Sequence, residues 1–352
     1  MKLKKLMSII LAVSLAGGLA ACGSGAKKED SPGTQAGQTT QEAGQKEASI
    51  ILTYAEVNPA DSLDGQVGSF FKEQVESLSN GSVTIDIQAS GVLGAENDVL
   101  DNMTAGGGTV DMARISCFAL TNYGGKLSAL PSVPFTFDNR EHYWKFAESE
   151  MGQKILDEPS GLGLGVKGLF LMEEGFRHFF FNAEIKGIED LKGKKIRVSS
   201  DPILTGVVDQ LGASPTVISF NELYSSLQSG VVDGADQPTA LYESNAFNEV
   251  APYLIEDGHT MSTSEVIITE DAWNKLSDGQ KAAVSEAGKA AGQYCRELSS
   301  KIEEESKERL KEKGVTFIEV ADKQPWKDAC QSIISEYTAG YENEYKQIVN
   351  LK

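Results

Sequence analysis

The sequence has few of the residues that most enzymes and metal proteins use for chemistry. Its 352 residues include only three histidines and four cysteines, and these show neither a zinc-site spacing nor a catalytic motif such as HExxH. Positive charge is also scarce, since 32 Lys and Arg stand against 51 Asp and Glu, a formal net charge of −19. A nucleic-acid surface needs a basic footprint, so that class of function is excluded. Any bound anion must therefore be held by nearby cations, against the negative electrostatic potential of the protein as a whole.

Two glycine-rich stretches match cofactor loops only in part. "GLGVKG" (163–168) fits G-x-G-x-x-G, but a strand-like apolar run follows where the dinucleotide fold requires a helix. "AGGGT" (105–109) lacks the lysine of a phosphate loop. We expect no cofactor, no metal site and no catalytic residue, and hence a protein that is not an enzyme.

The remaining histidines and cysteines are expected to be structural. His142, His178 and His259 occur singly, and a lone histidine is more often a satisfied structural residue than a catalyst. Three cysteines, Cys117, Cys295 and Cys330, are interpreted as small buried hydrophobic residues, with a Cys295–Cys330 pair left open.

The N-terminus has the pattern of a lipoprotein signal peptide. Lysines precede an apolar run over 6–19, and "LAAC" places small residues directly before Cys22. This predicts a leader over 1–21 and a lipidated Cys22, although an ordinary secretory leader with a chance cysteine is the alternative. The Gly-, Gln- and Thr-rich segment 22–48 predicts a flexible tether. We expect a protein held by lipid at the extracytoplasmic face of the cell membrane.

Strand and helix patterns alternate along the body in two separate series. In the first, strands are expected at 49–54, 82–88 and 110–116, with helices at 66–81 and 94–103. The second begins near 175–182 and has strands at 195–198, 215–218 and 231–238, with helices at 202–213 and 219–230. Ser219 and Glu222 match a capping box at the start of the last of these helices. Such alternation predicts two α/β lobes built on mainly parallel sheet.

A long helix is expected to join these lobes. Ser277 and Gln280 match a capping box, and an apolar helical stripe follows with no decisive break before Gly314. This span would be about 50 Å long, more than one small domain is wide. The helix must therefore pack across both lobes or extend beyond them. A strand over 315–320 then returns the C-terminal segment to a lobe.

One cation stands out in this acidic chain. Arg197 lies near the carboxyl end of the strand expected at 195–198, and ligands of open parallel sheets bind at such ends. Its planar guanidinium matches a carboxylate with two charge-assisted hydrogen bonds. The pattern alone leaves open that Arg197 is a surface residue on an edge strand.

The motifs of both series together resemble those of a known family. The segments are "SNGSVTIDI", "GVLGAEND", "VDMA", "GFRHFFFN", "IEDLKGKKIRV", "LGASPTVISFNELYSSLQSGVVDGADQP" and "NEVAPYLIEDGHT". Their order and spacing resemble the solute-binding proteins of tripartite ATP-independent periplasmic (TRAP) transporters, the DctP family. The resemblance runs from about Ile50 to the end of the long helix.

The resemblance implies an α/β fold, a two-lobed periplasmic-binding-protein-like (type II) clamp with a long helix bridging both lobes. We assign 49–173 plus 263–300 to lobe I and 174–262 plus 301–352 to lobe II.

The resemblance also implies roles for residues of the second lobe. Arg197 would form a bidentate salt bridge with the ligand carboxylate, and Arg177 would be the second arginine that reaches the ligand. Gln237 matches the family's amide, although "DGADQP" departs from the family's D-G-x-E-N-P, and Phe220 would cover an apolar face of the ligand.

The first lobe offers less regular candidates, chosen by their position after strands or before a helix. For each of them a turn or helix-cap role is an equal alternative. The candidates are Glu56, Asn58, Glu96, Arg114 and Ser116.

The expected function is to capture an organic acid and deliver it to the two integral membrane subunits of a TRAP transporter. Groups that recognise hydroxyls favour a sugar acid, such as a uronate or aldonate. A C4-dicarboxylate, with Arg114 as the second cation, and a ligand-sensing receptor are the alternatives. An ATP-driven importer's binding protein fits the motifs less well, and an enzyme on the same scaffold lacks an evident nucleophile.

Overall fold

The computed structural model describes residues 48–352. The predicted leader 1–21, Cys22 and all but the last residue of the tether 22–48 therefore lie outside the described residues. In the described part, no helix combines the length and the apolarity needed to cross a membrane.

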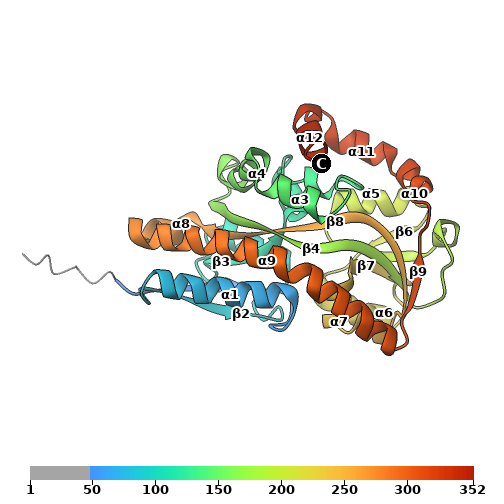
Figure 1. Cartoon of the computed structure of the whole chain (residues 1–352), viewed down its shortest axis with the longest axis horizontal. Helices are drawn as coiled ribbons and strands as arrows, with labels where there is room; N and C mark the ends of the chain where they lie inside the picture. Colours follow the sequence, from blue (N-terminus) through green and yellow to red (C-terminus); the bar gives the residue numbers. More distant parts are fainter. Residues whose placement is uncertain (1–47) are drawn as a thin grey trace, which may run out of the picture. The chain divides into compact units, whose positions relative to one another are not determined.

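The described residues form one nine-stranded mixed sheet flanked by helices (Figure 1). The strand order is β2-β1-β3-β8-β4-β7-β5-β6, and β9 pairs with β8. The strands are β1 (Ile50–Ala55), β2 (Val83–Gln88), β3 (Met112–Ser116), β4 (Val166–Phe181), β5 (Lys195–Val198), β6 (Ser214–Val217), β7 (Gly234–Pro238), β8 (Tyr253–Thr269) and β9 (Thr316–Glu319). The α-helices are α1 (Leu63–Leu78), α2 (Glu96–Thr104), α3 (Arg140–Ala147), α4 (Glu150–Gly161), α5 (Pro202–Gln210), α6 (Leu223–Gln228), α7 (Thr239–Ser244), α8 (Glu270–Lys275), α9 (Asp278–Glu312), α10 (Gln324–Ala329), α11 (Gln331–Thr338) and α12 (Glu342–Val349).

Two long antiparallel strands, β4 and β8, connect the two halves of the sheet. They have 16 and 17 residues and pair along most of their length. At one end of β8 the outer neighbour is β3, and at the other end it is β9. The expectation of a mainly parallel sheet is therefore wrong for the central strands of the sheet. It holds for the outer parts, where β1 pairs in parallel with β2 and β3, and β5 pairs in parallel with β6 and β7.

Each half of the sheet has its own hydrophobic core. Phe71 and Ile85 belong to the core of the β1–β3 half, and Ile196 and Val207 to a core of the β5–β7 half. The lobe limits given above remain a prediction. The C-terminal helix α12 packs toward the first half, because Ile348 shares a core with Phe137, Tyr143 and Phe146.

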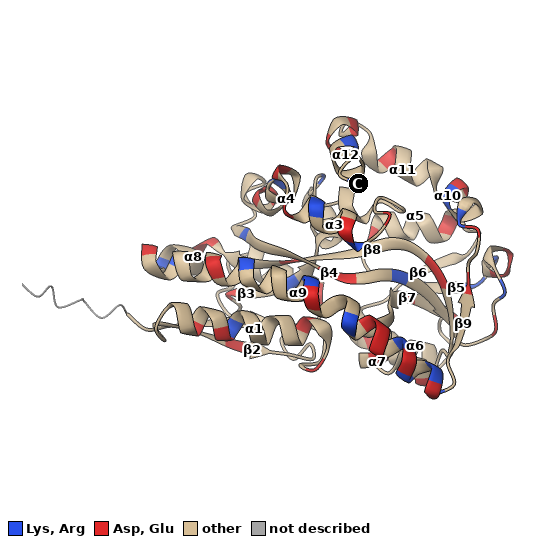
Figure 2. Cartoon of the chain, in the orientation of Figure 1, with Lys and Arg blue, Asp and Glu red and all other residues tan. Residues whose placement is uncertain are grey.

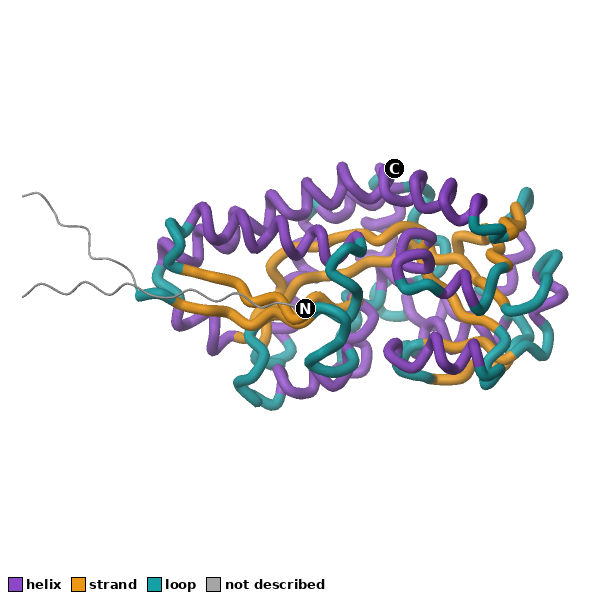
Figure 3. Tube along the Cα trace, turned by 90° about the horizontal axis from the view of Figure 1, so that it is seen from below, coloured by secondary structure: helices purple, strands orange, loops and turns teal. Residues whose placement is uncertain are grey.

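The long helix α9 spans both halves, as expected. The Ser277 hydroxyl accepts a hydrogen bond from the Gln280 backbone N–H, and the Gln280 side-chain oxygen accepts one from the Ser277 backbone N–H, so the predicted capping box is confirmed. Ala287 packs in the core of the first half and Leu310 in that of the second. Figure 3 shows this helix extending along one side of the strands. Acidic and basic residues are interspersed along its second part (Figure 2), where most positions are at least partly exposed, although Ser306 and Leu310 are buried.

The second predicted capping box is wrong. The Ser219 hydroxyl donates to the Glu222 carboxylate at 2.9 Å, and neither side chain caps a backbone N–H. The chain enters α6 through a short 3-10 helix, Phe220–Glu222. There the Glu222 N–H already donates to the Ser219 carbonyl oxygen, so the amide that the cap would satisfy is used.

The structural interpretation of the cysteines and histidines agrees with the described residues. Cys117, Cys295 and Cys330 are buried and free, so the Cys295–Cys330 pair left open above is absent. The three histidines are buried; for example, His142 Nε2 lies 2.9 Å from the Ile348 carbonyl oxygen.

Candidate functional site

A cavity lies where the two halves of the sheet meet, at the carboxyl ends of β3, β5 and β7. Eight of the nine predicted site residues line it, and the ninth, Glu56, is buried behind Arg114. Their contact with a ligand remains a prediction. The lining residues are Val57, Asn58, Glu96, Arg114, Ser116, Phe118, Glu174, Arg177, Arg197, Ser199, Phe220, Gln237 and Leu241.

Arg197 is a buried cation without an acidic partner. It lies in β5 between β7 and β6 and is 2% exposed, so it is not a surface residue on an edge strand. Its Nε donates to the Ile218 carbonyl oxygen at 2.8 Å, and none of the ion pairs among residues 48–352 includes it. Burial lowers the pKa of Arg197 to about 10, so the group stays charged at neutral pH. Its terminal nitrogens are therefore suited to an anion that enters the cavity.

Arg177 lines the same cavity but is already paired. Its Nε lies 2.5 Å from Asp236 Oδ2, and its Nη1 donates to the Ser262 hydroxyl at 3.2 Å. Although burial lowers the pKa of Arg177, the charge of Asp236 raises it overall. Much of its donor capacity is used within the protein, so Arg177 is a weaker candidate than Arg197 for the main carboxylate contact.

A buried network of charged side chains, Asp236, His259 and Asp257, supports Arg177. His259 Nε2 lies 3.3 Å from Asp236 Oδ2, and His259 Nδ1 lies 2.6 Å from Asp257 Oδ2. Burial lowers the pKa of His259, but the two carboxylates outweigh this effect and raise it to about 9. The imidazole is therefore protonated at neutral pH. This network of charged side chains fixes the guanidinium of Arg177 in place.

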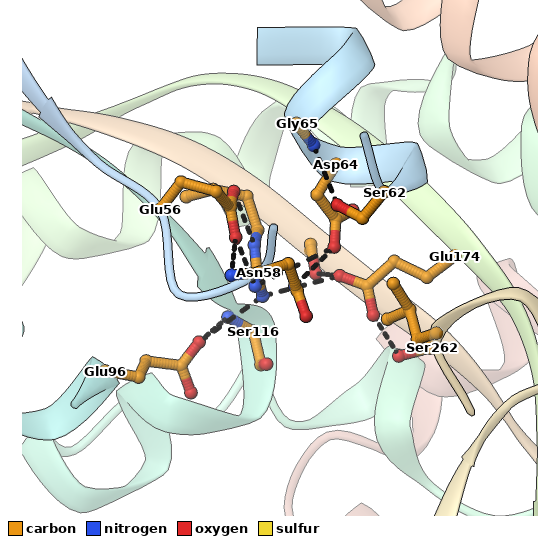
Figure 4. Close-up of polar contacts among 12 residues, drawn as sticks. Glu56, Asn58, Ser62, Asp64, Gly65, Glu96, Ser116, Glu174 and Ser262 are labelled. Atoms are coloured by element: carbon orange, nitrogen blue, oxygen red, sulfur yellow. Dashed lines mark hydrogen bonds and ion pairs between the residues drawn. The ribbon is translucent and has the colours of Figure 1, made fainter. Parts of the chain in front are cut away.

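Arg114 is surrounded by carboxylates that converge from four different parts of the chain (Figure 4). Its Nη2 lies 3.0 Å from Glu56 Oε1 and 3.8 Å from Asp64 Oδ2. Its Nη1 lies 3.4 Å from Glu174 Oε1 and 3.6 Å from Glu96 Oε1. One guanidinium thus faces four acids, and this wall of the cavity is anionic.

Local structure explains how the acids reach Arg114. Glu56 directly follows β1, Asp64 lies in the first turn of α1, and Glu96 is the first residue of α2. Glu96 Oε1 accepts the Ser116 backbone N–H at 2.6 Å. Burial raises the pKa of Asp64 and of Glu96, against the opposing charge of Arg114.

Two further predicted residues complete the opposite wall. Gln237 lies in β7 opposite His178 and is 4% exposed. The Phe220 ring lies 5.9 Å from the Arg197 guanidinium and packs edge-on against Phe247. Both are positioned to line the cavity beside Arg197.

Direct contacts cross between the two halves at the rim. Asn122, in the 3-10 helix after β3, donates from Nδ2 to the Ser200 carbonyl oxygen at 2.7 Å. Asn245, after α7, donates to the Asn58 side-chain oxygen at 3.3 Å. These contacts hold the two walls together around the cavity.

Sequence reasoning missed Glu174, Asp64 and the network of Asp236, His259 and Asp257. Glu174 accepts hydrogen bonds from the Ser262 and Ser264 hydroxyls, and its pairing with Arg114 was not foreseen. A signal was present, because "MEEGFR" places two adjacent acids inside an otherwise apolar strand.

A two-lobed clamp that encloses a small, charged cavity between its halves is the architecture of a solute-binding protein. The chain belongs to the family described as bacterial extracellular solute-binding protein, family 7, whose model matches residues 54–340. Members of this family are the solute-binding subunits of TRAP transporters and act outside the cytoplasm. They are transport proteins, not enzymes.

Similar proteins are known in sequence and in structure. A solute-binding protein of Roseobacter denitrificans is 34% identical over 269 residues, covering 76% of this chain and 81% of the relative. Its structure with bound L-galactonate has a TM-score of 0.77 at 30% identity, covering 87% and 99% of the two chains. A TRAP solute-binding protein from Pseudomonas putida F1, with bound D-glucuronate, has a TM-score of 0.81 at 30% identity and covers 85% and 96%.

Proposed function

We propose that this protein captures a monocarboxylate sugar acid, a uronate or an aldonate, and delivers it to the membrane subunits of a TRAP transporter. The observation that carries this proposal is Arg197, a buried guanidinium with no acidic partner among the described residues. A ligand carboxylate would supply the missing negative charge.

The surroundings of Arg197 favour a ligand with hydroxyl groups. Gln237 and Ser116 offer neutral hydrogen-bonding groups, and Glu96 and Glu174 offer acceptors. Phe220 would cover an apolar face of a sugar ring. The proteins similar in structure that bind D-glucuronate and L-galactonate support the same class of ligand.

Binding would favour the closed arrangement of the clamp. A carboxylate held by Arg197 on one half brings the ligand's hydroxyls within reach of Glu96 and Ser116 on the other. Contacts to both halves are available only when the halves approach each other, so the ligand stabilises that state.

The proposed location follows from the N-terminus. Lipidation of Cys22 after removal of 1–21 would anchor the protein, and the tether 22–48 would let the clamp reach its membrane partners. Mass spectrometry of the N-terminal peptide from membrane fractions would test this; an unmodified Cys22 would refute the anchor.

The test of the proposed ligand is a binding screen with a matched variant. Isothermal titration calorimetry with D-glucuronate, D-galacturonate and L-galactonate should show binding, whereas succinate, malate and glucose should bind weakly or not at all. Arg197→Ala should lose about 2 to 5 kcal/mol of binding free energy, because the ligand carboxylate would be buried without its partner.

Arg296→Ala is the control. Arg296 lies in α9, away from the cavity, and pairs with Glu141 and Glu148 at the two ends of α3. Its affinity should match that of the wild type. Retained affinity in Arg197→Ala would refute the role of this residue, and preferential binding of succinate or malate would refute the ligand class.

A further inference from the structure

We infer that Glu96 and Glu174 form an anionic screen that admits a hydroxylated end of the ligand and rejects a second carboxylate. This inference rests on the proposed function, namely that Arg197 holds one carboxylate of a sugar acid. It assigns a role in ligand selectivity to the anionic cavity wall around Arg114. Arg114 itself then has no role as a second cation that binds a ligand carboxylate.

The charges in the cavity are separated. Arg197 provides a positive group without an acidic partner at one end. At the other end Arg114 is shared among Glu56, Asp64, Glu96 and Glu174, all within 4.0 Å of its terminal nitrogens. A ligand with negative charge at one end only is complementary to such a cavity.

Two of the four acids face the ligand space. Glu56 is fully occupied by Arg114 and by the Asn58 backbone N–H, and Asp64 accepts from the Asn58 side chain. Neither of these acids lines the cavity, whereas Glu96 and Glu174 do. These two carboxylates are therefore the ones a ligand would meet.

Both of the acids that line the cavity are held in place by neutral donors. Glu96 receives the Ser116 backbone N–H at 2.6 Å, and Glu174 receives the Ser262 hydroxyl at 2.7 Å. These bonds use only some of the acceptor positions that a carboxylate offers. A ligand hydroxyl can donate to the rest, but a ligand carboxylate has no hydrogen to donate and meets like charge.

The guanidinium of Arg114 cannot offset that repulsion. Its Nε and Nη2 already donate to Glu56, and its Nη1 lies between Glu96 and Glu174. Like charges brought together in such an interface disfavour binding by several kcal/mol, which corresponds to at least about 100-fold in affinity.

The matched ligand pair for the test is L-galactonate and galactarate. They share a carbon chain and stereocentres, and they differ at one terminal carbon, which carries a hydroxyl in the first and a carboxylate in the second. Calorimetry at mildly alkaline pH favours the ionised form of Glu96, because burial raises the pKa of its carboxyl group.

The wild type should bind L-galactonate at least about 100-fold more tightly than galactarate. Glu96→Gln and Glu174→Gln each remove one negative charge and keep the shape of the side chain. Each should reduce this ratio by about tenfold or more, mainly through tighter binding of galactarate. Glu73→Gln removes one charge from an exposed position of α1 and should leave the ratio unchanged.

The outcomes separate the two proposals. If neither L-galactonate nor the uronates D-glucuronate and D-galacturonate bind to the wild type, the proposed function fails. If L-galactonate binds and galactarate binds equally well, or if the glutamine variants keep the wild-type ratio, the ligand class stands and the anionic screen is refuted. Circular dichroism melting curves would establish that the variants remain folded.

Discussion

At the scale of single residues, three arginines of the cavity have the same charge and different surroundings. Among the described residues, Arg197 has a backbone carbonyl as its hydrogen-bond partner and no ion pair, Arg177 is paired with Asp236, and Arg114 is shared among four acids. The free energy available for binding an anion therefore differs among them. The residue with the fewest internal partners is the best candidate for the ligand carboxylate.

Another buried acid is Glu265 in β8. It is 0% exposed, and neither of its carboxylate oxygens has a hydrogen-bond partner among residues 48–352. Burial, with a smaller contribution from the charge of Glu158, raises the pKa of Glu265 to about 8. The folded protein therefore holds a proton here that the unfolded chain releases at about pH 4.

This difference predicts how stability depends on pH. Glu265 favours folding below its unfolded pKa, and that contribution is lost as pH rises to about 8. Glu265→Gln cannot ionise, so its free energy of unfolding relative to the wild type should rise by a few kcal/mol between about pH 5 and pH 9, at about 1.4 kcal/mol per pKa unit. Urea denaturation at several pH values measures this.

The exposed substitution Ser300→Ala, which changes no titratable group, is the control, and its difference from the wild type should stay constant with pH. A constant difference for Glu265→Gln as well would mean that Glu265 is ionised or solvated in the folded protein.

The sequence identifies the candidate residues of the site better than their partners. Arg197 and Arg114 could be found because they lie near the ends of short strands, where a sheet places its ligands. Gln237 could be found through the resemblance of "DGADQP" to the family motif. The pairing of Arg114 with Asp64 and Glu174 could not, because these contacts join residues 50 and 60 positions away through tertiary structure. Local pattern carries no information about such distances.

At the scale of elements, the N-terminus of α9 is the best-defined helix start. Ser277 accepts the Gln280 N–H at 3.1 Å, and Gln280 also donates to the Ala48 carbonyl oxygen, which ties the start of the described chain to this helix. The cap satisfies a backbone donor that would otherwise lack a partner.

Ser277→Ala should therefore lower the free energy of unfolding by about 1 kcal/mol, the usual contribution of an N-cap side chain. Ser300→Ala, at an exposed position within the same helix, should change it by less than about 0.5 kcal/mol. Chemical denaturation measures both. Equal effects of the two substitutions would show that the cap does not stabilise the fold.

The elements that the sequence predicted well are those with a clear period and a clear end. Helix α1 has apolar residues at helical spacing and ends before Asn80-Gly81, and β2 alternates between buried and exposed positions. In contrast, β4 and β8 are buried along nearly their whole length. Because both faces of these strands are covered, apolar and polar residues do not alternate with period two along them. Their full extent and their antiparallel pairing were therefore not predicted.

At the scale of the whole clamp, closure depends on contacts that cross between the halves. The bond from Asn122 to the Ser200 carbonyl oxygen is formed three residues beyond Arg197, next to the proposed carboxylate site. Because it joins the two halves, we expect it to stabilise the closed state and to influence ligand release.

Asn122→Ala should weaken sugar-acid binding by about three- to tenfold, the effect of one hydrogen bond, and mainly by a faster dissociation rate. Stopped-flow fluorescence with calorimetry measures this. Asn182→Ala, an exposed asparagine after β4, is the control with wild-type kinetics. A slower association rate with unchanged dissociation would argue against a role in holding the clamp closed.

The adjacent residues Glu173 and Glu174 of β4 point to opposite faces of the sheet, as neighbours in a strand do. Glu174 faces the cavity and bonds Ser262, whereas Glu173 bonds Arg140 at 2.6 Å and Ser299 of α9 on the far side. Gly175 follows with φ of 104°, next to Glu303 of the same helix. This stretch of strand therefore contacts the cavity on one face and α9 on the other. A small rotation of the strand that accommodates a ligand would be transmitted to the long helix.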